Sequence, residues 1–257
     1  MSDWNPELYL KFEQERTQPV RDLVARIPMP SPARIIDLGC GPGNSTAVLR
    51  ERWPGSHVVG LDSSPAMIEK ARNARSDIEW VQGDAAADLS HLGAFDLVFA
   101  NASLQWLPDH RQLMPQLMRS VTSGGILAAQ IPKFEEMPMA AAIRETSNLP
   151  PYSRFFAGFD PGVHLFEEAV YYEALRDLTR ALDLWVTHYY HVLKDHPAII
   201  DWMSSTGLRP FLDRLPEDCR QSFSAEVLER VKRAYPAQSD GKVFFIFKRF
   251  FFIAHKL

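Results

Sequence analysis

The sequence predicts an α/β fold, a doubly wound and mostly parallel seven-stranded sheet with a helical cap and insertion over its binding edge. Five short apolar runs between residues 34 and 131 alternate with helical patterns, as parallel β–α–β units require. Acids or amides stand at the ends of four of these runs. A glycine-rich turn follows the first run, and ligands of such sheets bind outside the carboxyl ends of the strands.

The first predicted strand, residues 34–38, leads into a turn with glycine at every second position. Gly39, Gly41 and Gly43 have no side chain, so a ligand can approach the backbone closely and positive φ is allowed. Residues 44–46, Asn-Ser-Thr, offer helix N-caps before the apolar positions that follow. Strand, turn and helix start together predict a nucleotide-type site.

The composition of this turn argues against two common phosphate sites. A dinucleotide-binding loop has a third glycine where this chain has Asn44, and no Lys-Ser or Lys-Thr pair follows as in a P-loop. We expect Asp37 to lie at the mouth of the turn, where an acid repels a pyrophosphate but attracts a cation. The turn therefore suits a ligand with an ammonium and a sulfonium group, S-adenosylmethionine (SAM).

The second predicted strand, residues 57–62, ends at Asp62, about 20 residues beyond the turn, where an acid accepts hydrogen bonds from both ribose hydroxyls. Ser64 and Pro65 predict the N-cap and first residue of the next helix. Met67 on the inner face of that helix belongs to the core or covers the adenine, and we favour the second interpretation.

The third predicted strand, residues 78–82, is followed by Asp84 and Ala85. We expect Asp84 to accept from the adenine amino group while the N–H of Ala85 reaches a ring nitrogen. The alternative for Asp84 is a loop aspartate that caps the next turn. The fourth strand, residues 95–100, leads into a segment, residues 101–109, that we place over the site of chemistry.

The next helix is predicted to start at Pro108 or Asp109, and Gly124-Gly125 to precede the fifth strand, residues 126–131. Before the core, residues 6–27 predict a helix that Pro19 breaks or restarts. Within residues 1–30 this helix either caps the sheet or forms a lid over the cofactor. The side chains available for a lid are Trp4, Tyr9, Phe12 and Arg16.

The rest of the single predicted domain, residues 1–257, departs from the β–α rhythm. Residues 132–166 are rich in Pro, Met and aromatics, and we expect a partly helical insertion that covers the substrate, with further covering helices in residues 196–236. The expected elements in chain order are a helix at 167–181, a strand at 183–193, helices at 197–205 and 216–235, and a last antiparallel strand at 242–256.

Composition limits the class of protein. A net charge of −4 and a pI near 6.1 argue against general affinity for nucleic acid. Cys40 and Cys219 lie far apart without metal-ligand spacing, so we expect reduced thiols and no metal. No signal peptide or membrane-spanning run is visible, which favours a cytoplasmic location and no membrane or obligate protein partner.

The stretch Asp37-Leu-Gly-Cys-Gly-Pro-Gly43 resembles the first motif of class I SAM-dependent methyltransferases, which have a Rossmann-like fold. Over nearly its full length the chain also resembles one bacterial subfamily of these enzymes, and residues 133–165 match least well. The resemblance is most specific in residues 1–10, 37–46, 62–68, 99–110, 198–202 and 206–210. That subfamily transfers methyl from SAM to one carboxylate of a small tricarboxylate, which gives a monomethyl ester.

The resemblance and the strand-end positions together predict the residues that bind SAM. They are Asp37, Gly39, Cys40, Gly41, Asn44, Asp62, Ser63, Met67, Asp84, Ala85, Asn101, Ser103 and Trp106.

A tricarboxylate needs cations and donors. Arg209 is the first candidate, because it lies between Gly207 and Pro210 in a predicted loop, and its alternative is a surface pair with Asp213. Further candidates are Lys133 after the fifth strand, Gln105, Tyr189, Tyr190 and Tyr9. We interpret His191 as structural.

No residue is predicted to act as a catalytic acid or base, since a carboxylate is already ionised at pH 7. Rate enhancement would come from in-line alignment and removal of water. Two alternatives stay open: a SAM-dependent methyltransferase for another small acid, a phenol or an amine, and a SAM-binding module without catalysis. A phenol or an amine would require a base. A nicotinamide-dependent reductase is disfavoured by Asn44.

Overall fold

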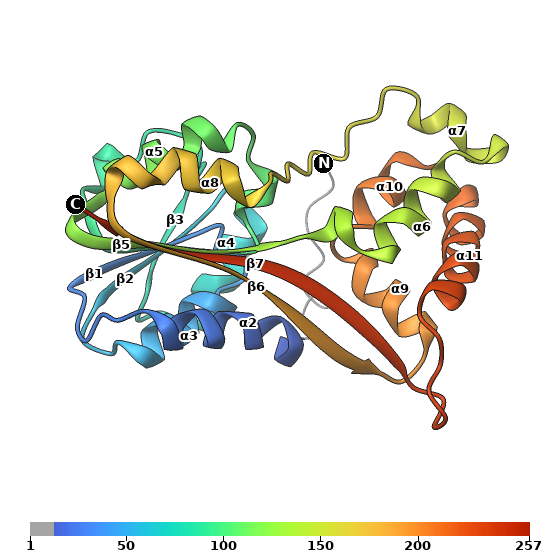
Figure 1. The fold of residues 1–257 in the computed structure, drawn as a ribbon, viewed down its shortest axis with the longest axis horizontal. Helices are drawn as coiled ribbons and strands as arrows, with labels where there is room; N and C mark the ends of the chain where they lie inside the picture. Colours follow the sequence, from blue (N-terminus) through green and yellow to red (C-terminus); the bar gives the residue numbers. More distant parts are fainter. Residues whose placement is uncertain (1–12) are drawn as a thin grey trace. The chain divides into compact units, whose positions relative to one another are not determined.

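A computed structural model describes residues 13–257 of the chain (Figure 1). Seven strands form one sheet in the order β3-β2-β1-β4-β5-β7-β6. Their bounds are β1 Arg34–Leu38, β2 His57–Asp62, β3 Glu79–Gln82, β4 Phe95–Asn101, β5 Val121–Pro132, β6 Thr179–Leu193 and β7 Val243–Lys256. β1 pairs in parallel with β2 and β4, β2 with β3, and β4 with β5. The predicted α/β class with a mostly parallel sheet is confirmed.

The last strand runs antiparallel to β5, as the sequence predicts. The N–H of Lys133 donates to the carbonyl of Lys248, whereas the Oγ of Ser123 donates to the carbonyl of Leu257. Residue numbers therefore rise along β5 while they fall along β7, which makes the sheet a mixed one.

Among the described residues, the chain divides into two compact units. The sheet unit comprises Glu13–Pro132, Val163–Val186 and Phe250–Leu257, and the helical unit comprises Lys133–Gly162 and Thr187–Arg249. The sheet unit carries α2 Glu13–Arg26, α3 Asn44–Arg52, α4 Pro65–Ala74, α5 His110–Arg119 and α8 Glu168–Leu175. The helical unit carries α6 Pro138–Ser147, α7 Pro150–Phe156, α9 His196–Ser204, α10 Arg209–Arg214 and α11 Glu217–Ala234.

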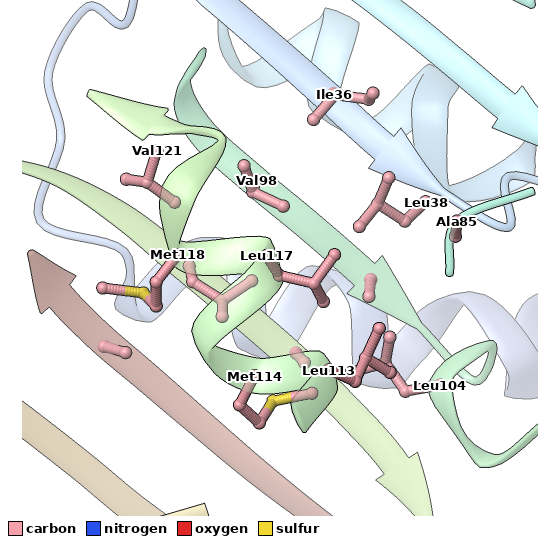
Figure 2. Close-up of a cluster of buried hydrophobic side chains, with 14 of the residues drawn as sticks. Ile36, Leu38, Ala85, Val98, Leu104, Leu113, Met114, Leu117, Met118 and Val121 are labelled. Carbon is pink, nitrogen blue, oxygen red and sulfur yellow. The ribbon is translucent and has the colours of Figure 1, made fainter. Parts of the chain in front are cut away.

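In the sheet unit, α2 and α3 cover one face of the strands while α5 and α8 cover the other (Figure 1). The sequence of α5 places Leu113, Met114, Leu117 and Met118 on one stripe, and all four are buried. Figure 2 shows these side chains together with Ile36, Leu38 and Val98 in one hydrophobic core. This core makes a rigid support for the loops at the carboxyl ends of the strands.

Several local predictions are confirmed. Ser64 is the N-cap of α4, its Oγ accepts from the N–H of Met67, and a proline follows at the first helical position. Asp109 is the N-cap of α5, where its carboxylate accepts from the N–H of Gln112. Each cap fixes the direction in which the chain leaves the edge of the sheet.

Other predictions of element bounds are wrong. Pro19 does not break α2 but lies inside it. Gly124-Gly125 lies within β5, because a register shift between Phe95 and Leu97 of β4 takes up the extra residues and Gly124 adopts a φ of 73°. The helix expected to reach residue 181 ends at Leu175, since a 3-10 turn at Arg176–Leu178 leads directly into β6.

The described part of α2 behaves as a cap of the sheet. Val20, Leu23, Val24 and Ile27 are buried in the sheet unit, as the amphipathic pattern predicts. The lid residues Trp4, Tyr9 and Phe12 lie outside the described residues. No helix from residue 13 onward is both long and apolar enough to span a bilayer.

Candidate functional site

The three glycines of the turn after β1 have different tasks. A Cβ on Gly39, which has a φ of 68°, would stand 2.4 Å from the Cβ of Ser103. A Cβ on Gly43, with a φ of 98°, would stand 2.7 Å from the indole of Trp80. Of these three glycines, Gly41 is the one at which an added Cβ would have no other atom within 4 Å. Packing therefore requires two of these glycines, and Gly41 is the one at which a ligand can approach the backbone.

Asp37 lies beneath the start of α3. It is fully buried, and its Oδ2 accepts from the Oγ of Ser45 at 2.6 Å and from the Oγ1 of Thr46 at 2.7 Å. The expected place at an open mouth is therefore wrong. The expected capping by residues 44–46 is wrong too, because Gly43 is the N-cap of α3 and the two hydroxyls serve Asp37 instead.

Burial raises the pKa of Asp37 to about 6, against the effect of the two hydroxyls and with a smaller contribution from the charge of Asp62. Its Oδ1 has no hydrogen-bond partner in the described part of the chain. A buried carboxylate oxygen in this state favours a nearby cation.

Asp62 ends β2 and connects the turn to the next helix. Its Oδ2 accepts from the N–H of Gly41 at 2.8 Å, and its Oδ1 accepts from the N–H of Ser64 at 2.9 Å. A carboxylate only accepts hydrogen bonds, which is the chemistry that ribose hydroxyls require. Beside it, Ser63 is exposed and Met67 is buried.

Asp84 follows β3 and is exposed. Its Oδ1 accepts from the N–H of Ala86 at 2.8 Å, which is the turn-capping role named as the alternative. A contact with adenine stays a prediction for Asp84 and for Ala85, which is buried. Because β3, β2 and β1 are adjacent and parallel, Asp84, Asp62 and Asp37 lie at the same edge of the sheet.

The segment after β4 completes this edge. Ser103 donates through its Oγ to the carbonyl of Leu38 at 2.6 Å, and the Nε2 of Gln105 donates to the carbonyl of Ala102 at 2.7 Å. Ala102 has a φ of 50°, a left-handed conformation that costs about 1 kcal/mol for a residue with a side chain. Such strain next to a strand end is typical of functional sites.

Three buried acceptor atoms lack a hydrogen-bond partner among residues 13–257 at this edge. They are Oδ1 of Asp37, Oδ1 of Asn101 and Oε1 of Gln105, which belong to the neighbouring strands β1 and β4 and the turn after β4. Native proteins leave few such atoms unpaired. These three acceptors suit a ligand that brings donors or positive charge.

His110 holds the segment after β4 in place, a role that was not predicted from the sequence. It is fully buried, with its Nε2 2.9 Å from the carbonyl of Leu104 and 3.1 Å from that of Leu107. Its Nδ1 lies 2.7 Å from the Oη of Tyr171 in α8. Burial lowers the pKa of His110, so the ring is neutral, donates through Nε2 and accepts at Nδ1. No local sequence pattern signals a contact between residues so far apart.

The remaining cofactor candidates lie on the same loops. Cys40 is buried and its N–H donates to the carbonyl of Leu61, Asn44 is the first residue of α3, and Trp106 is half-buried in the turn after β4. Their contacts with a cofactor stay predictions.

The helical unit holds most of the substrate candidates. The prediction that Arg209 lies in a loop is wrong, because it is the first residue of α10. Its Nε lies 3.4 Å from the Oδ2 of Asp213. Lys133 is buried, and its Nζ lies 2.6 Å from the Oε1 of Glu136. Tyr190 is 60% exposed, whereas Tyr189 is partly buried. Tyr9 lies outside the described residues.

Several known proteins resemble this chain in sequence. A family model described as a methyltransferase domain matches residues 35–125. A trans-aconitate 2-methyltransferase of Azoarcus sp. (strain BH72) is 44% identical over 254 residues, covering 99% of each chain. The enzyme of the same name from Escherichia coli (strain K12 / DH10B) is 43% identical over 262 residues and covers both chains completely.

Solved structures share the fold at low identity. The YcgJ protein from Bacillus subtilis has a TM-score of 0.58 at 12% identity, covering 92% of this chain and 97% of that one. A geranyl diphosphate methyltransferase in complex with SAM has a TM-score of 0.53 at 14% identity, covering 98% and 90%. At such identities the likeness concerns the fold alone.

Proposed function

Because the chain belongs to the trans-aconitate 2-methyltransferase family, we propose that it transfers a methyl group from SAM to a carboxylate of trans-aconitate. The products are the monomethyl ester and S-adenosylhomocysteine. The observation that carries the proposal is full-length similarity above 40% to relatives of that name. The unpaired acceptor atoms at the sheet edge support the proposal independently, because they suit a methyl donor that carries positive charge.

The chain's own residues supply a site for SAM. Asp62 accepts from the ribose hydroxyls while it holds the N–H of Gly41, and the open space at Gly41 admits the ligand to the backbone. The acceptors of Asn101 and Gln105, with the buried carboxylate of Asp37, favour the ammonium and sulfonium charges. Met67, Asp84 and Ala85 are assigned to the adenine. When bound, SAM supplies a methyl group activated by a sulfonium sulfur.

The reaction needs no proton transfer. An oxygen of the substrate carboxylate forms a bond to the methyl carbon as the carbon–sulfur bond breaks, and the electron pair of that bond stays on sulfur. One negative and one positive charge disappear together, so a water-poor site favours the reaction. The chain contributes alignment of oxygen, carbon and sulfur and the exclusion of water.

The mechanism uses no catalytic base, and two titratable groups near the sheet edge are already engaged in structural hydrogen bonds. His110 uses both ring nitrogens for contacts that hold the turn after β4, and Asp37 uses one oxygen to hold α3. Each of these groups therefore has a structural role in the site. The nucleophile itself, a carboxylate with an ordinary pKa near 4, is ionised throughout the neutral range.

Charged and polar groups of the chain would hold the remaining carboxylates. Arg209, Lys133, Gln105 and Tyr189 stay our candidates, although Arg209 and Lys133 each have an acidic neighbour in the helical unit. A guanidinium has five donors in a planar fork, so a contact through Nε is compatible with a second, bidentate one.

A panel of acids tests the proposal. The protein is incubated with SAM labelled in its methyl group and with di- and tricarboxylic acids, and base-labile label is counted in each product. We expect trans-aconitate to be the best acceptor. Label in another acid, with none in trans-aconitate, would favour the alternative of a methyltransferase for a different small acid. SAM binding without label in any acid would indicate a binding module.

A further inference from the structure

The turn after β4 is too short to fix its own conformation. It is a single 3-10 helix, Leu104–Trp106, and backbone hydrogen bonds from the N–H groups of Trp106 and Leu107 close it. Its N-cap residue, Ser103, uses its Oγ for the carbonyl of Leu38. Hydrogen-bond geometry in 3-10 helices is poor, and so short a helix is not stable by itself. The conformation of this turn therefore depends on contacts from other parts of the chain.

Donors from outside the turn hold three of the carbonyls in and next to it. The Nε2 of His110 lies 2.9 Å from the carbonyl of Leu104 and 3.1 Å from that of Leu107. The carbonyl of Gln105, between them, accepts from the N–H of His164 at 2.7 Å. The backbone of the turn is thus held on both sides of Gln105 and at Gln105 itself.

The N–H of His164 comes from a segment that we name the return segment, residues 163–166, because here the chain re-enters the sheet unit. The ring of Phe166 packs against the imidazole of His110, with centroids 4.7 Å apart. Tyr171 in α8, the next helix, reaches the same imidazole, and α8 lies against α5 (Figure 1). The return segment therefore contacts the turn directly through His164 and indirectly through Phe166 and His110.

Gln105 is the residue of this turn that faces the proposed ligand. It is 6% exposed, and its Nε2 donates to the carbonyl of Ala102 at 2.7 Å. Its Oε1 has no hydrogen-bond partner among residues 13–257. An amide held at its nitrogen has few orientations left, so the position of the turn decides where Oε1 points. The φ of 50° at Ala102 agrees with this, because such a conformation persists only where its surroundings hold it.

We propose that the return segment positions Gln105 for SAM, with His164 and Phe166 as positioning residues. The N–H of His164 fixes the backbone of Gln105, and Phe166 fixes the imidazole that holds the carbonyls on either side. This assignment rests on the function proposed above, in which Oε1 of Gln105 accepts from the cationic donor, and adds the residues that preorganise this acceptor. All of them belong to the sheet unit.

A double-mutant cycle between Phe166 and Gln105 tests the assignment. The variants are Phe166→Ala, Gln105→Ala and the double variant, with Phe166→Tyr to keep the ring. Leu178→Ala is the matched control, because Leu178 is also partly buried against the same hydrophobic core but lies in the turn after α8. Calorimetry measures the Kd for SAM without any methyl acceptor, and urea unfolding measures the stability of each variant.

We expect Phe166→Ala to raise the Kd for SAM by roughly 5–20-fold, the size expected when one hydrogen bond to a charged ligand is weakened. Phe166→Tyr should restore the affinity to within about threefold. In the Gln105→Ala background, Phe166→Ala should raise the Kd by less than about twofold, because the acceptor that it positions is already absent. The loss of stability should be the same in both backgrounds, whereas Leu178→Ala should lose stability with its Kd unchanged.

A substitution that removes a backbone donor tests the contact of His164. His164→Pro removes the N–H that donates to Gln105, whereas His164→Ala shortens the side chain and keeps the N–H. We expect the proline variant to raise the Kd for SAM several-fold and the alanine variant to raise it less. Equal effects of the two substitutions would remove the N–H of His164 from the assignment.

An unchanged Kd in Phe166→Ala, or an equal rise in both Gln105 backgrounds, would overturn the proposal. Should Phe166→Ala fail to fold, Phe166→Leu replaces it in the cycle, since leucine keeps apolar volume but removes the ring. If the wild-type protein binds SAM but methylates no tricarboxylate, the proposed reaction fails while the cycle still decides the role of the return segment. No heat with SAM in the wild type would refute both.

Discussion

Replacement of Asp62 by alanine isolates the ribose contact at the sheet edge. The carboxylate accepts from the N–H groups of Gly41 and Ser64 and, in the proposed complex, from two ribose hydroxyls. A hydrogen bond to a charged group contributes about 1.5–3 kcal/mol, and Asp62 is half-buried, so we take the lower value for each hydroxyl. The sum of ~3 kcal/mol corresponds to a Kd for SAM that is roughly 100-fold higher.

The two lost backbone contacts have a separate consequence. Water can replace a half-buried carboxylate at the N–H groups of Gly41 and Ser64, so we expect a loss of stability of about 1 kcal/mol for each. Urea unfolding measures this loss, and calorimetry with SAM measures the affinity. The two readouts separate a damaged turn from a missing ribose contact.

Asp88→Ala is the matched control. Its carboxylate also accepts from a backbone N–H two residues later, that of Ser90 at 3.0 Å, but on an exposed turn. We expect the Kd for SAM to be unchanged in this variant. Equal affinities of the Asp62 and Asp88 variants would refute the assignment of Asp62 to the ribose.

Three further predictions concern the sheet unit. Because burial raises the native pKa of Asp37 from 3.8 to about 6, its contribution to stability is full below about pH 4 and is lost as the pH rises through 6. Relative to Asp37→Asn, the wild type should lose up to ~3 kcal/mol between pH 4 and pH 7 in urea unfolding, and parallel stability curves would contradict this reasoning. Gly43→Ala should cost roughly 2–4 kcal/mol, because a positive φ and contact with Trp80 act together, whereas Gly41→Ala should cost about 1 kcal/mol but weaken SAM binding. If Gly41→Ala lost more stability in unfolding and Gly43→Ala lost more SAM affinity in calorimetry, the roles assigned to the two glycines would be wrong. Tyr171→Phe should cost about 1–2 kcal/mol, because it leaves the buried Nδ1 of His110 without its donor. The exposed Tyr172→Phe should cost less than about 0.5 kcal/mol, and equal melting temperatures would argue against the His110 anchor.

The parallel core was predictable because its signals are local. Strand runs that end at Asp62 or before Asp84, and the caps Ser64 and Asp109, depend on neighbours within a few residues. The course of β5 was less predictable, since Gly124-Gly125 reads as a turn and only the pairing with β4 draws it into a strand. Pro19 likewise reads as a helix break, although α2 continues through it.

The polar residues of the site and of β7 were harder to predict because they depend on distant contacts. Lys248-Arg249 reads as a pair of charges that interrupts an apolar strand, yet alternation separates the two side chains. Lys248 pairs with Glu136, while Arg249 is buried beside Phe247. Similarly, no periodicity distinguishes His110 from a surface residue at the start of α5, and only its contacts with Leu104 and Tyr171 reveal its role.

The most direct test of the account is the rate of trans-aconitate methylation as a function of pH at saturating SAM. The nucleophile is a carboxylate that is ionised well below neutrality, so we predict a kcat that is flat between about pH 6.5 and pH 8.5. The product should carry one methyl ester that alkali removes. A kcat that rises with an apparent pKa inside this range would reveal a catalytic base and contradict the mechanism.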